Sequence, residues 1–118
     1  MYKQGDILLI PIPFSDLSSH KKRPVLVLSN NSYQDKTEDM LVAAITSNIL
    51  EKEFEVQITN NDMHVGTLKK ISCIRADKLY NLSQHIVDRK FGTVNKTIVE
   101  KVKQQVNRLL DQPKTTGR

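Results

Sequence analysis

The spacing of the apolar residues changes once along this chain, near residue 95, and that change limits the folds it can adopt. Up to residue 94 the apolar residues form short runs bounded by polar or turn-forming residues, which is typical of strands. After residue 95 they recur at helical spacing, with Ile98, Val102, Val106 and Leu109 on one face. Short strands followed by one amphipathic helix predict an α+β domain, mainly β, in which a small, strongly bent antiparallel sheet packs on the helix.

Turn residues and prolines mark where these elements begin and end. Pro11 should end the pairing of the first strand, because proline has no N–H to donate. Asn95 suits the N-cap of the helix, and Pro113 lies just past its end. We expect residues 1–112 to form a single domain and residues 113–118 to form a disordered tail. The expected strands cover residues 7–12, 25–29, 40–46, 53–58, 68–74 and 86–94, with a short segment at 79–82 and a polar loop, able to hold a helical turn, at 30–39.

Charge and cysteine content restrict the partners and the compartment. A net charge of +5 favours an anionic partner without identifying it. The single cysteine, Cys73, excludes an intrachain disulfide, and its apolar neighbours predict a buried core residue rather than a nucleophile. The apolar runs are far shorter than a membrane span, and the N-terminus lacks the layout of a signal peptide. We therefore expect a cytoplasmic protein that does not bind membranes.

A basic loop runs directly into an apolar strand at Lys21-Lys22-Arg23-Pro24. Proline disfavours the helical region for the residue before it, so Arg23 should be extended at the mouth of the strand. Its guanidinium stays charged and offers a planar fork of donors, which suits a phosphate. Further cations occur at Lys69-Lys70, at Arg75 with Lys78, and at Arg89-Lys90. They would form a phosphate-binding track if their strands share a face, and otherwise a solvated basic surface.

Four segments, in order, resemble the MazF/PemK family of toxin endoribonucleases. They are Gly5 to Phe14, the strand that begins at Arg23-Pro24, Ala43 to Ser47, and Cys73 to Leu79. The similarity covers nearly the whole chain. It implies an SH3-like barrel of bent antiparallel strands with a C-terminal helix, and an activity against single-stranded RNA that needs no cofactor. It also implies a homodimer that is neutralised by an acidic, partly disordered antitoxin.

The resemblance implies two sets of catalytic residues. In one, Arg23 stabilises the charged phosphoryl oxygens during attack by the ribose 2′-hydroxyl, and Thr46 hydrogen-bonds the phosphate. In the other, Asp77 accepts the 2′ proton beside Arg75, with His20 from the preceding loop. The Arg75-Ala76-Asp77 segment is equally compatible with a plain surface ion pair, and the sequence does not choose between the two sets. Candidate RNA-binding residues are Lys21, Lys22, Ser47, Lys69, Lys70 and Lys78.

Other functions remain open on sequence alone. His20, His64 and His85 are isolated along the chain, so their spacing does not favour a metal site. A non-enzymatic toxin of the same fold would inhibit DNA gyrase through its C-terminal helix. A basic barrel could also bind RNA without cutting it. Base stacking needs aromatic side chains, and the candidates are Phe14, Tyr33 and Tyr80.

Overall fold

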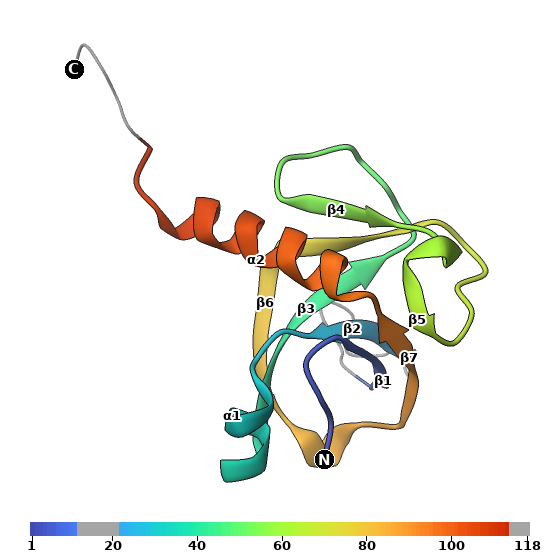
Figure 1. The fold of residues 1–118 in the computed structure, drawn as a ribbon, viewed down its shortest axis with the longest axis vertical. Helices are drawn as coiled ribbons and strands as arrows, with labels where there is room; N and C mark the ends of the chain where they lie inside the picture. The colour runs from blue at the N-terminus through green and yellow to red at the C-terminus, as the bar shows by residue number, and fades with distance from the viewer. Residues whose placement is uncertain (12–21, 114–118) are drawn as a thin grey trace.

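Seven strands form one antiparallel sheet that curls round on itself (Figure 1). The structure, a computed structural model, describes residues 1–11 and 22–113. The strand order is β4-β6-β3-β2-β1-β7-β5. The strands are β1 (Asp6–Ile10), β2 (Arg23–Val27), β3 (Asp39–Thr46), β4 (Glu55–Ile58), β5 (Met63–Val65), β6 (Ser72–Ser83) and β7 (Arg89–Val94). The helices are α1 (Asn31–Lys36) and α2 (Lys96–Leu110), with 3₁₀ turns η1 (Asn60–Asp62) and η2 (Gln84–Ile86).

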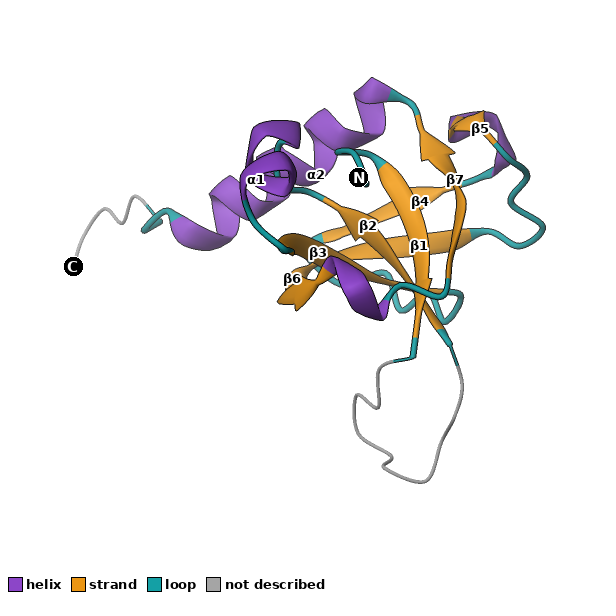
Figure 2. Cartoon of the chain, turned by 90° about the horizontal axis from the view of Figure 1, so that it is seen from below, coloured by secondary structure: helices purple, strands orange, loops and turns teal. Residues whose placement is uncertain are grey.

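These elements confirm the expected fold class, an α+β domain that is mainly β. Figure 2 shows α2 on one side of the curled sheet, where it packs against β6 and β4. Its buried residues are Ile98, Val99 and Val102, which is the first half of the face that the sequence spacing predicts, whereas Leu109 at the far end of that face is exposed. Burying each of these side chains contributes roughly 1.5–3 kcal/mol. Among the described residues, no helix has the length and apolar character needed to cross a bilayer.

Apolar side chains pack on both faces of the sheet. On one face Ile7 and Leu26 belong to the cluster that α2 covers. On the other face Leu8, Val25 and Val42 belong to a second buried cluster. Residues of the two clusters alternate along β1 and β2, because successive side chains of a strand point to opposite faces. The central strands are therefore apolar on both faces. This burial fixes the register of β1 to β3 and thereby the position of every side chain at their ends.

Several strand boundaries differ from the expected ones. The segments expected at 68–74 and 79–82 form parts of one strand, β6, which starts only at Ser72. A bulge in β6 sets residues 76–78 between its pairs with Ala43 and Ala44, which is why the sequence pattern breaks there. β4 begins after Phe54, whose φ of 67° lies in the left-handed region. β7 begins at Arg89 because residues 84–86 form η2. The last residue of the strand expected at 7–12 and residues 114–118 of the expected tail lie outside the described residues.

Candidate functional site

Arg23 and Thr46 lie at adjoining ends of two paired strands. Arg23 opens β2 and Thr46 closes β3. The antiparallel pairing of the two strands extends to Val25 and Ala44, and Arg23 and Thr46 each lie two residues beyond that pair along their strands. Both residues line each of two neighbouring hollows in the surface. The structure therefore brings together Arg23 and Thr46, one of the two sets of residues that the resemblance implies.

The first hollow, called hollow A, has a volume of about 320 Å³. It combines three cationic side chains with a hydroxyl, an amide and a phenol. Arg23, Arg75 and Lys78 supply the charge, and a concentration of like charge in one concavity attracts an anion. The lining residues are Arg23, Ala44, Ile45, Thr46, Asn48, Leu50, Arg75, Lys78 and Tyr80.

The second hollow, called hollow B, lies beside hollow A and shares Arg23, Ile45 and Thr46 with it. Its volume is about 390 Å³. It carries four cationic side chains on a partly apolar floor, so it can hold phosphate groups near its rim and apolar atoms deeper in. The lining residues are Lys22, Arg23, Pro24, Ile45, Thr46, Ser47, Thr67, Leu68, Lys69, Lys70, Ser72 and Phe91.

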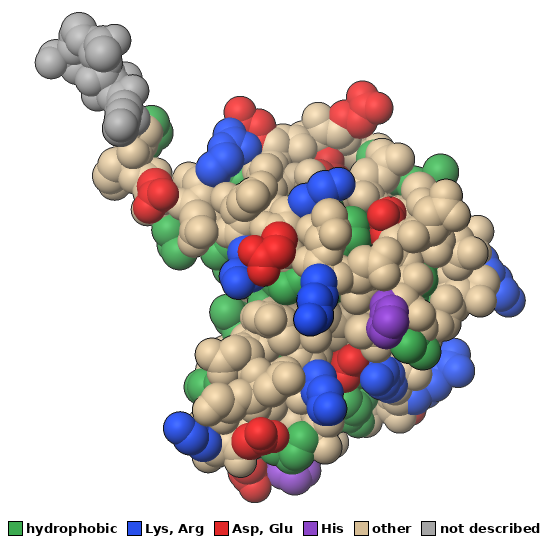
Figure 3. Space-filling model, in the orientation of Figure 1, with side chains coloured by type: hydrophobic (Ala, Val, Ile, Leu, Met, Phe, Trp, Pro, Cys, Tyr) green, Lys and Arg blue, Asp and Glu red, His purple; other side chains and the backbone are tan. Residues whose placement is uncertain are grey.

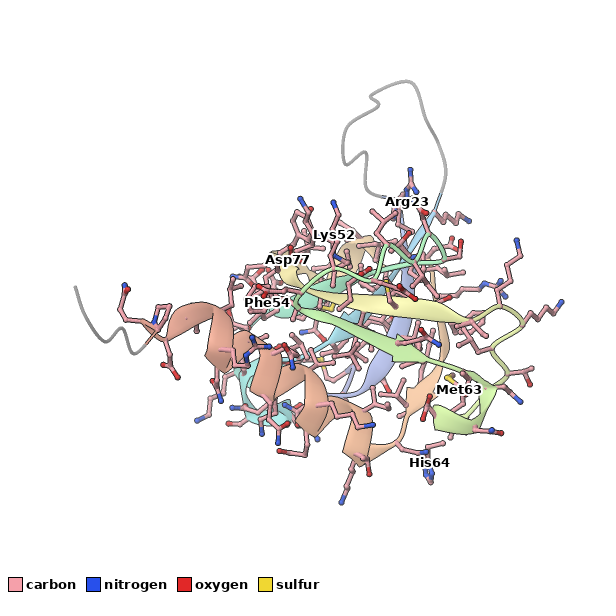
Figure 4. The ribbon with its side chains drawn as sticks, turned by 90° about the horizontal axis from the view of Figure 1, so that it is seen from above. Arg23, Lys52, Phe54, Met63, His64 and Asp77 are labelled. Atoms are coloured by element: carbon pink, nitrogen blue, oxygen red, sulfur yellow. The ribbon has the colours of Figure 1, made fainter. Side chains whose placement is uncertain are left out.

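The two arginines of hollow A differ in their partners. Arg75 donates from Nε to Oδ1 of Asp77 at 3.0 Å and from Nη2 to Oδ2 at 2.9 Å. Arg23 is exposed, and no carboxylate of the described chain lies within ion-pairing distance of it. In Figure 4 its side chain projects from the start of β2. Among the described residues, Arg23 can therefore receive a phosphate without first giving up an ion-pair partner, whereas Arg75 is already engaged by Asp77.

The ion pair sets the ionisation of both partners. The hydrogen bond from Arg75 lowers the pKa of Asp77 below its ordinary value, because it stabilises the charged carboxylate. The same bond raises the pKa of Arg75. Only 16% of the Arg75 side chain and 29% of the Asp77 side chain are exposed, so this pair is more than a solvated surface contact. Asp77 is consequently a weaker base than a free aspartate.

The hydroxyl oxygen of Thr46 is held by a backbone N–H two residues further along the chain. The N–H of Asn48 donates to Oγ1 of Thr46 at 3.0 Å, a local turn that threonine readily forms. With one lone pair occupied in this way, the O–H of Thr46 can still donate to a phosphate oxygen. Thr46 is half-buried at the junction of the two hollows, which limits the ways in which it can turn.

A buried thiol lies on the strand that carries Arg75. Cys73 pairs with Thr46 across β3 and β6 and is fully buried, which confirms the prediction of a buried residue. Its Sγ donates to Oε2 of Glu55 at 2.8 Å. Burial, and then this hydrogen bond, raise the pKa of Cys73 to about 12. The thiol is therefore protonated at neutral pH and is a poor nucleophile.

Most of the predicted site residues line one of the two hollows, and some do not. Lys22, Ser47, Lys69 and Lys70 line hollow B, and Lys78 lines hollow A. Lys22 is also tied to Asp88, with its Nζ at 2.9 Å from Oδ1. Asp77 contacts Arg75 but lines neither hollow. His20, Lys21 and the stacking candidate Phe14 lie outside the described residues.

The remaining histidines are remote from this site. Figure 4 places His64 and Arg23 at opposite ends of the molecule. His85 lies next to Glu38, 3.2 Å from Nε2 to Oε1. In the described part of the chain, no three His, Cys, Asp or Glu side chains are arranged to hold a metal ion. Figure 3 shows Lys and Arg side chains interspersed with Asp and Glu on one face of the molecule, so that face carries no continuous basic patch.

Sequence reasoning missed Asn48 and Glu55. Asn48 lines hollow A and orients Thr46, and its position two residues after a threonine was the available signal. Glu55 accepts from Cys73 and from the backbone N–H of Lys52. It thereby ties β6 to the segment between β3 and β4, and only the pairing of β4 with β6 reveals this.

The solved structures with this fold include bacterial toxins. A mycobacterial endoribonuclease, solved in complex with its cognate antitoxin, is 16% identical with a TM-score of 0.75, covering 96% of this chain and 100% of its own. Mycobacterium tuberculosis toxin MazF-mt6 is 18% identical with a TM-score of 0.73, covering 92% and 98%. MazF from Deinococcus radiodurans is 22% identical with a TM-score of 0.73, covering 92% and 96%. At these identities the likeness establishes the fold.

The family follows from a separate comparison. The comparison with curated proteins gave no match. Residues 3–110 match the family model described as PemK-like, MazF-like toxin of type II toxin-antitoxin system. That span contains β1 to β7 and α2, and therefore both hollows. The chain belongs to the PemK-like, MazF-like toxin family of type II toxin–antitoxin systems.

Proposed function

We propose that this protein is the toxin of a type II toxin–antitoxin pair and that it cleaves single-stranded RNA without a metal ion. One observation carries the proposal: the Arg23 guanidinium, which forms no ion pair within the described chain, shares hollow A with the Thr46 hydroxyl. Family membership supports it, because structures that share the fold include a protein described as an endoribonuclease.

In this mechanism the ribose 2′-hydroxyl attacks the adjacent phosphorus while the bond from phosphorus to the 5′ oxygen breaks. The products are a 2′,3′-cyclic phosphate and a 5′-hydroxyl, and the proton lost by the 2′ oxygen balances the proton gained by the 5′ oxygen. Negative charge grows on the phosphoryl oxygens during attack. Arg23 and the O–H of Thr46 would stabilise that charge from fixed positions, and such preorganised donors supply much of the rate in phosphoryl transfer.

This assignment favours Arg23 and Thr46 over the Arg75 and Asp77 pair as the reacting groups. Both carboxylate oxygens of Asp77 accept hydrogen bonds from Arg75, and the pKa of Asp77 is lowered. A carboxylate held in this way has little tendency to take the 2′ proton. Arg75 instead contributes a fixed positive charge to the wall of hollow A, which helps to hold the RNA backbone.

The same proposal names the partners. Single-stranded RNA and an acidic antitoxin are both anionic, and the chain carries a net charge of +5. Several structures with this fold contain an antitoxin, among them MazE-MazF from Deinococcus radiodurans. We include a cytoplasmic homodimer in the proposal, and a disordered acidic antitoxin that would cover the two hollows as it folds on binding.

The test is digestion of single-stranded RNA by the purified protein in excess chelator, with fragment ends identified by mass spectrometry. We expect fragments that end in 2′,3′-cyclic phosphate. Arg23→Ala and Thr46→Val should greatly slow their formation, whereas Thr46→Ser keeps the hydroxyl and should retain activity. Arg108→Ala is a matched control, because that guanidinium lies over the ring of Phe54, 5.3 Å from its centroid, away from both hollows.

Three outcomes would contradict the proposal. Cleavage that appears only on addition of a divalent cation would overturn the metal-independent mechanism. Retardation of RNA in a gel with no cleavage under any condition would favour a binding protein. Inhibition of DNA gyrase that survives Arg23→Ala would favour a non-enzymatic toxin of the same fold.

A further inference from the structure

An apolar slot adjoins hollow B and shares five lining residues with it. Its volume is about 110 Å³. Ile7, Leu9, Pro24, Leu68 and Phe91 form most of its wall, and the last three also line hollow B. The hydroxyl of Ser72, the polar side chain at the slot, already donates to the carbonyl of Lys70 at 3.1 Å. The slot therefore offers apolar surface and an aromatic ring directly behind a basic rim.

A bulge in the sheet aims Phe91 at this slot. β1 pairs Ile7 with Gly92 and Leu8 with Lys90, so Phe91 is the extra residue of β7 between two consecutive pairs. An extra residue of this kind re-aims its side chain relative to the regular strand. Phe91 packs on the core that α2 covers while remaining half-buried, so one part of its ring stays accessible from hollow B.

Two glycines hold this bulge in place. A Cβ on Gly92 would lie 2.5 Å from the carbonyl oxygen of Val65. A Cβ on Gly66 would lie 2.9 Å from the carbonyl oxygen of Phe91, and Gly66 has a φ of +92°, which other residues rarely adopt. The backbones of β5 and β7 therefore approach more closely than side chains would permit. The backbone that carries Phe91 is consequently held close to β5, and the ring itself packs against the core.

The charges around the slot indicate the chemistry of its occupant. Arg23, Lys69 and Lys70 line hollow B and form no ion pair with any carboxylate among the described residues. A flat apolar group with a phosphate attached on each side would satisfy both the slot and the rim. That description fits a nucleotide within a strand, since single-stranded nucleic acids bind by stacking bases on aromatic side chains and placing phosphates on cations.

We propose that the slot receives one nucleobase of the bound RNA and that this base stacks on Phe91. The inference rests on the proposed function, because it places the base next to the linkage that Arg23 holds. Stacking is nearly independent of base identity, and Ser72, which carries the slot's one hydroxyl among the described residues, already donates it to Lys70. Phe91 is therefore a binding residue that adds affinity and fixes the register of the strand, with little choice among the four bases.

The test measures binding of a fluorescein-labelled, fully 2′-O-methylated single-stranded RNA of random sequence. This probe lacks the attacking hydroxyl, so binding is measured apart from cleavage. Phe91→Leu keeps the apolar bulk but removes the aromatic face, whereas Phe91→Tyr keeps the face. We expect Phe91→Leu to weaken binding about five- to 150-fold, which is the range of base stacking, and Phe91→Tyr to bind within about twofold of wild type. Phe54→Leu is the same exchange at a residue that lines neither hollow, and it should leave the affinity for the RNA unchanged.

A salt titration separates stacking from charge. Phe91→Leu should shift the plot of log affinity against log salt without changing its slope, since no phosphate contact is lost. Equal binding by wild type and Phe91→Leu would overturn the slot, as would equal weakening by the Leu and Tyr variants while both unfold at the wild-type temperature. If the wild type cleaves RNA and Phe91→Leu does not change the affinity for the probe, only the proposal that a base enters the slot is refuted. If RNA affinity depends on Phe91 as expected but the wild type does not cleave RNA, only the proposed nuclease activity is refuted.

Discussion

Arg75 and Asp77, two residues apart on β6, are joined by two parallel hydrogen bonds of 3.0 and 2.9 Å. This bidentate pair engages one of the two arginines that line hollow A, so that among the described residues Arg23 is the guanidinium of the hollow without an ion-pair partner. Two arginines in one concavity therefore have different tasks. Arg75 is a fixed part of the wall, and Arg23 is a ligand for the substrate.

The pair should make part of the stability depend on acid pH. The pKa of Asp77 is lowered in the native state, first by the hydrogen bond from Arg75. The unfolded chain therefore binds this proton more tightly. The stabilisation is fully present above about pH 4, near the ordinary pKa of aspartate, and is lost as the pH falls through the lower native pKa. Asp77→Asn removes the effect, so urea midpoints should differ between wild type and this variant at pH 7 and converge toward pH 2. A difference that stays constant across that range would contradict the pairing.

The thiol of Cys73 should be nearly inert in the native protein. Its pKa of about 12 and its burial leave very little thiolate at neutral pH. We expect its reaction with a disulfide reagent at pH 7.5 to be at least about a hundredfold slower than in the urea-unfolded chain, because the thiolate is the reacting form. Glu55→Gln removes the anionic acceptor and should accelerate labelling. Rapid labelling of the native wild type would show that the contact with Glu55 does not persist in solution.

Replacing Gly92 tests the close approach of β5 and β7. An added Cβ would meet the carbonyl oxygen of Val65 at 2.5 Å, so the backbone would have to move. Gly92→Ala should destabilise the protein by about 1–3 kcal/mol, as overpacking typically does. Denaturant unfolding measures this, and Val65→Ala, which trims a side chain that is 53% exposed, should cost far less. Equal stability of Gly92→Ala and wild type would mean that the two strands are further apart.

The lysines of hollow B should govern the salt dependence of RNA binding. Lys69 and Lys70 are exposed on the rim, and each phosphate contact on a single strand contributes a slope of about 0.7. Lys69→Gln with Lys70→Gln should reduce the slope of log affinity against log salt by about 1.4. Lys101→Gln with Lys103→Gln on α2 is the matched control, and it should leave the slope unchanged. An unchanged slope in the first double variant would place the RNA elsewhere.

Much of the fold follows from local patterns. Alternating and continuous apolar runs located β1 to β3, and helical spacing located α2 and the buried face of its first turns. Leu109, expected on the same face, is exposed because the end of α2 extends past the sheet. The meeting of Arg23 and Thr46 was predicted through the family resemblance, and the register of β2 with β3 explains it physically. The assignment of residues 1–112 to one domain and of residues 113–118 to a disordered tail remains a prediction.

Other features depend on pairing between distant segments, which no local pattern encodes. β6 continues through a bulge at residues 76–78 that interrupts its alternation. Phe91 faces hollow B because β7 carries one extra residue against β1. The contact of Cys73 with Glu55 spans two strands that pair only in the folded sheet. In each case the long-range register decides where a side chain points.

The single-turnover cleavage rate of Arg23→Ala, measured beside its affinity for the uncleavable RNA, tests the central assignment most directly. If Arg23 stabilises the charge that develops at phosphorus, its removal should lower the rate about a hundred- to a thousandfold, with a much smaller loss of affinity. Arg108→Ala should leave both unchanged. Cleavage by Arg23→Ala at the wild-type rate would contradict the account.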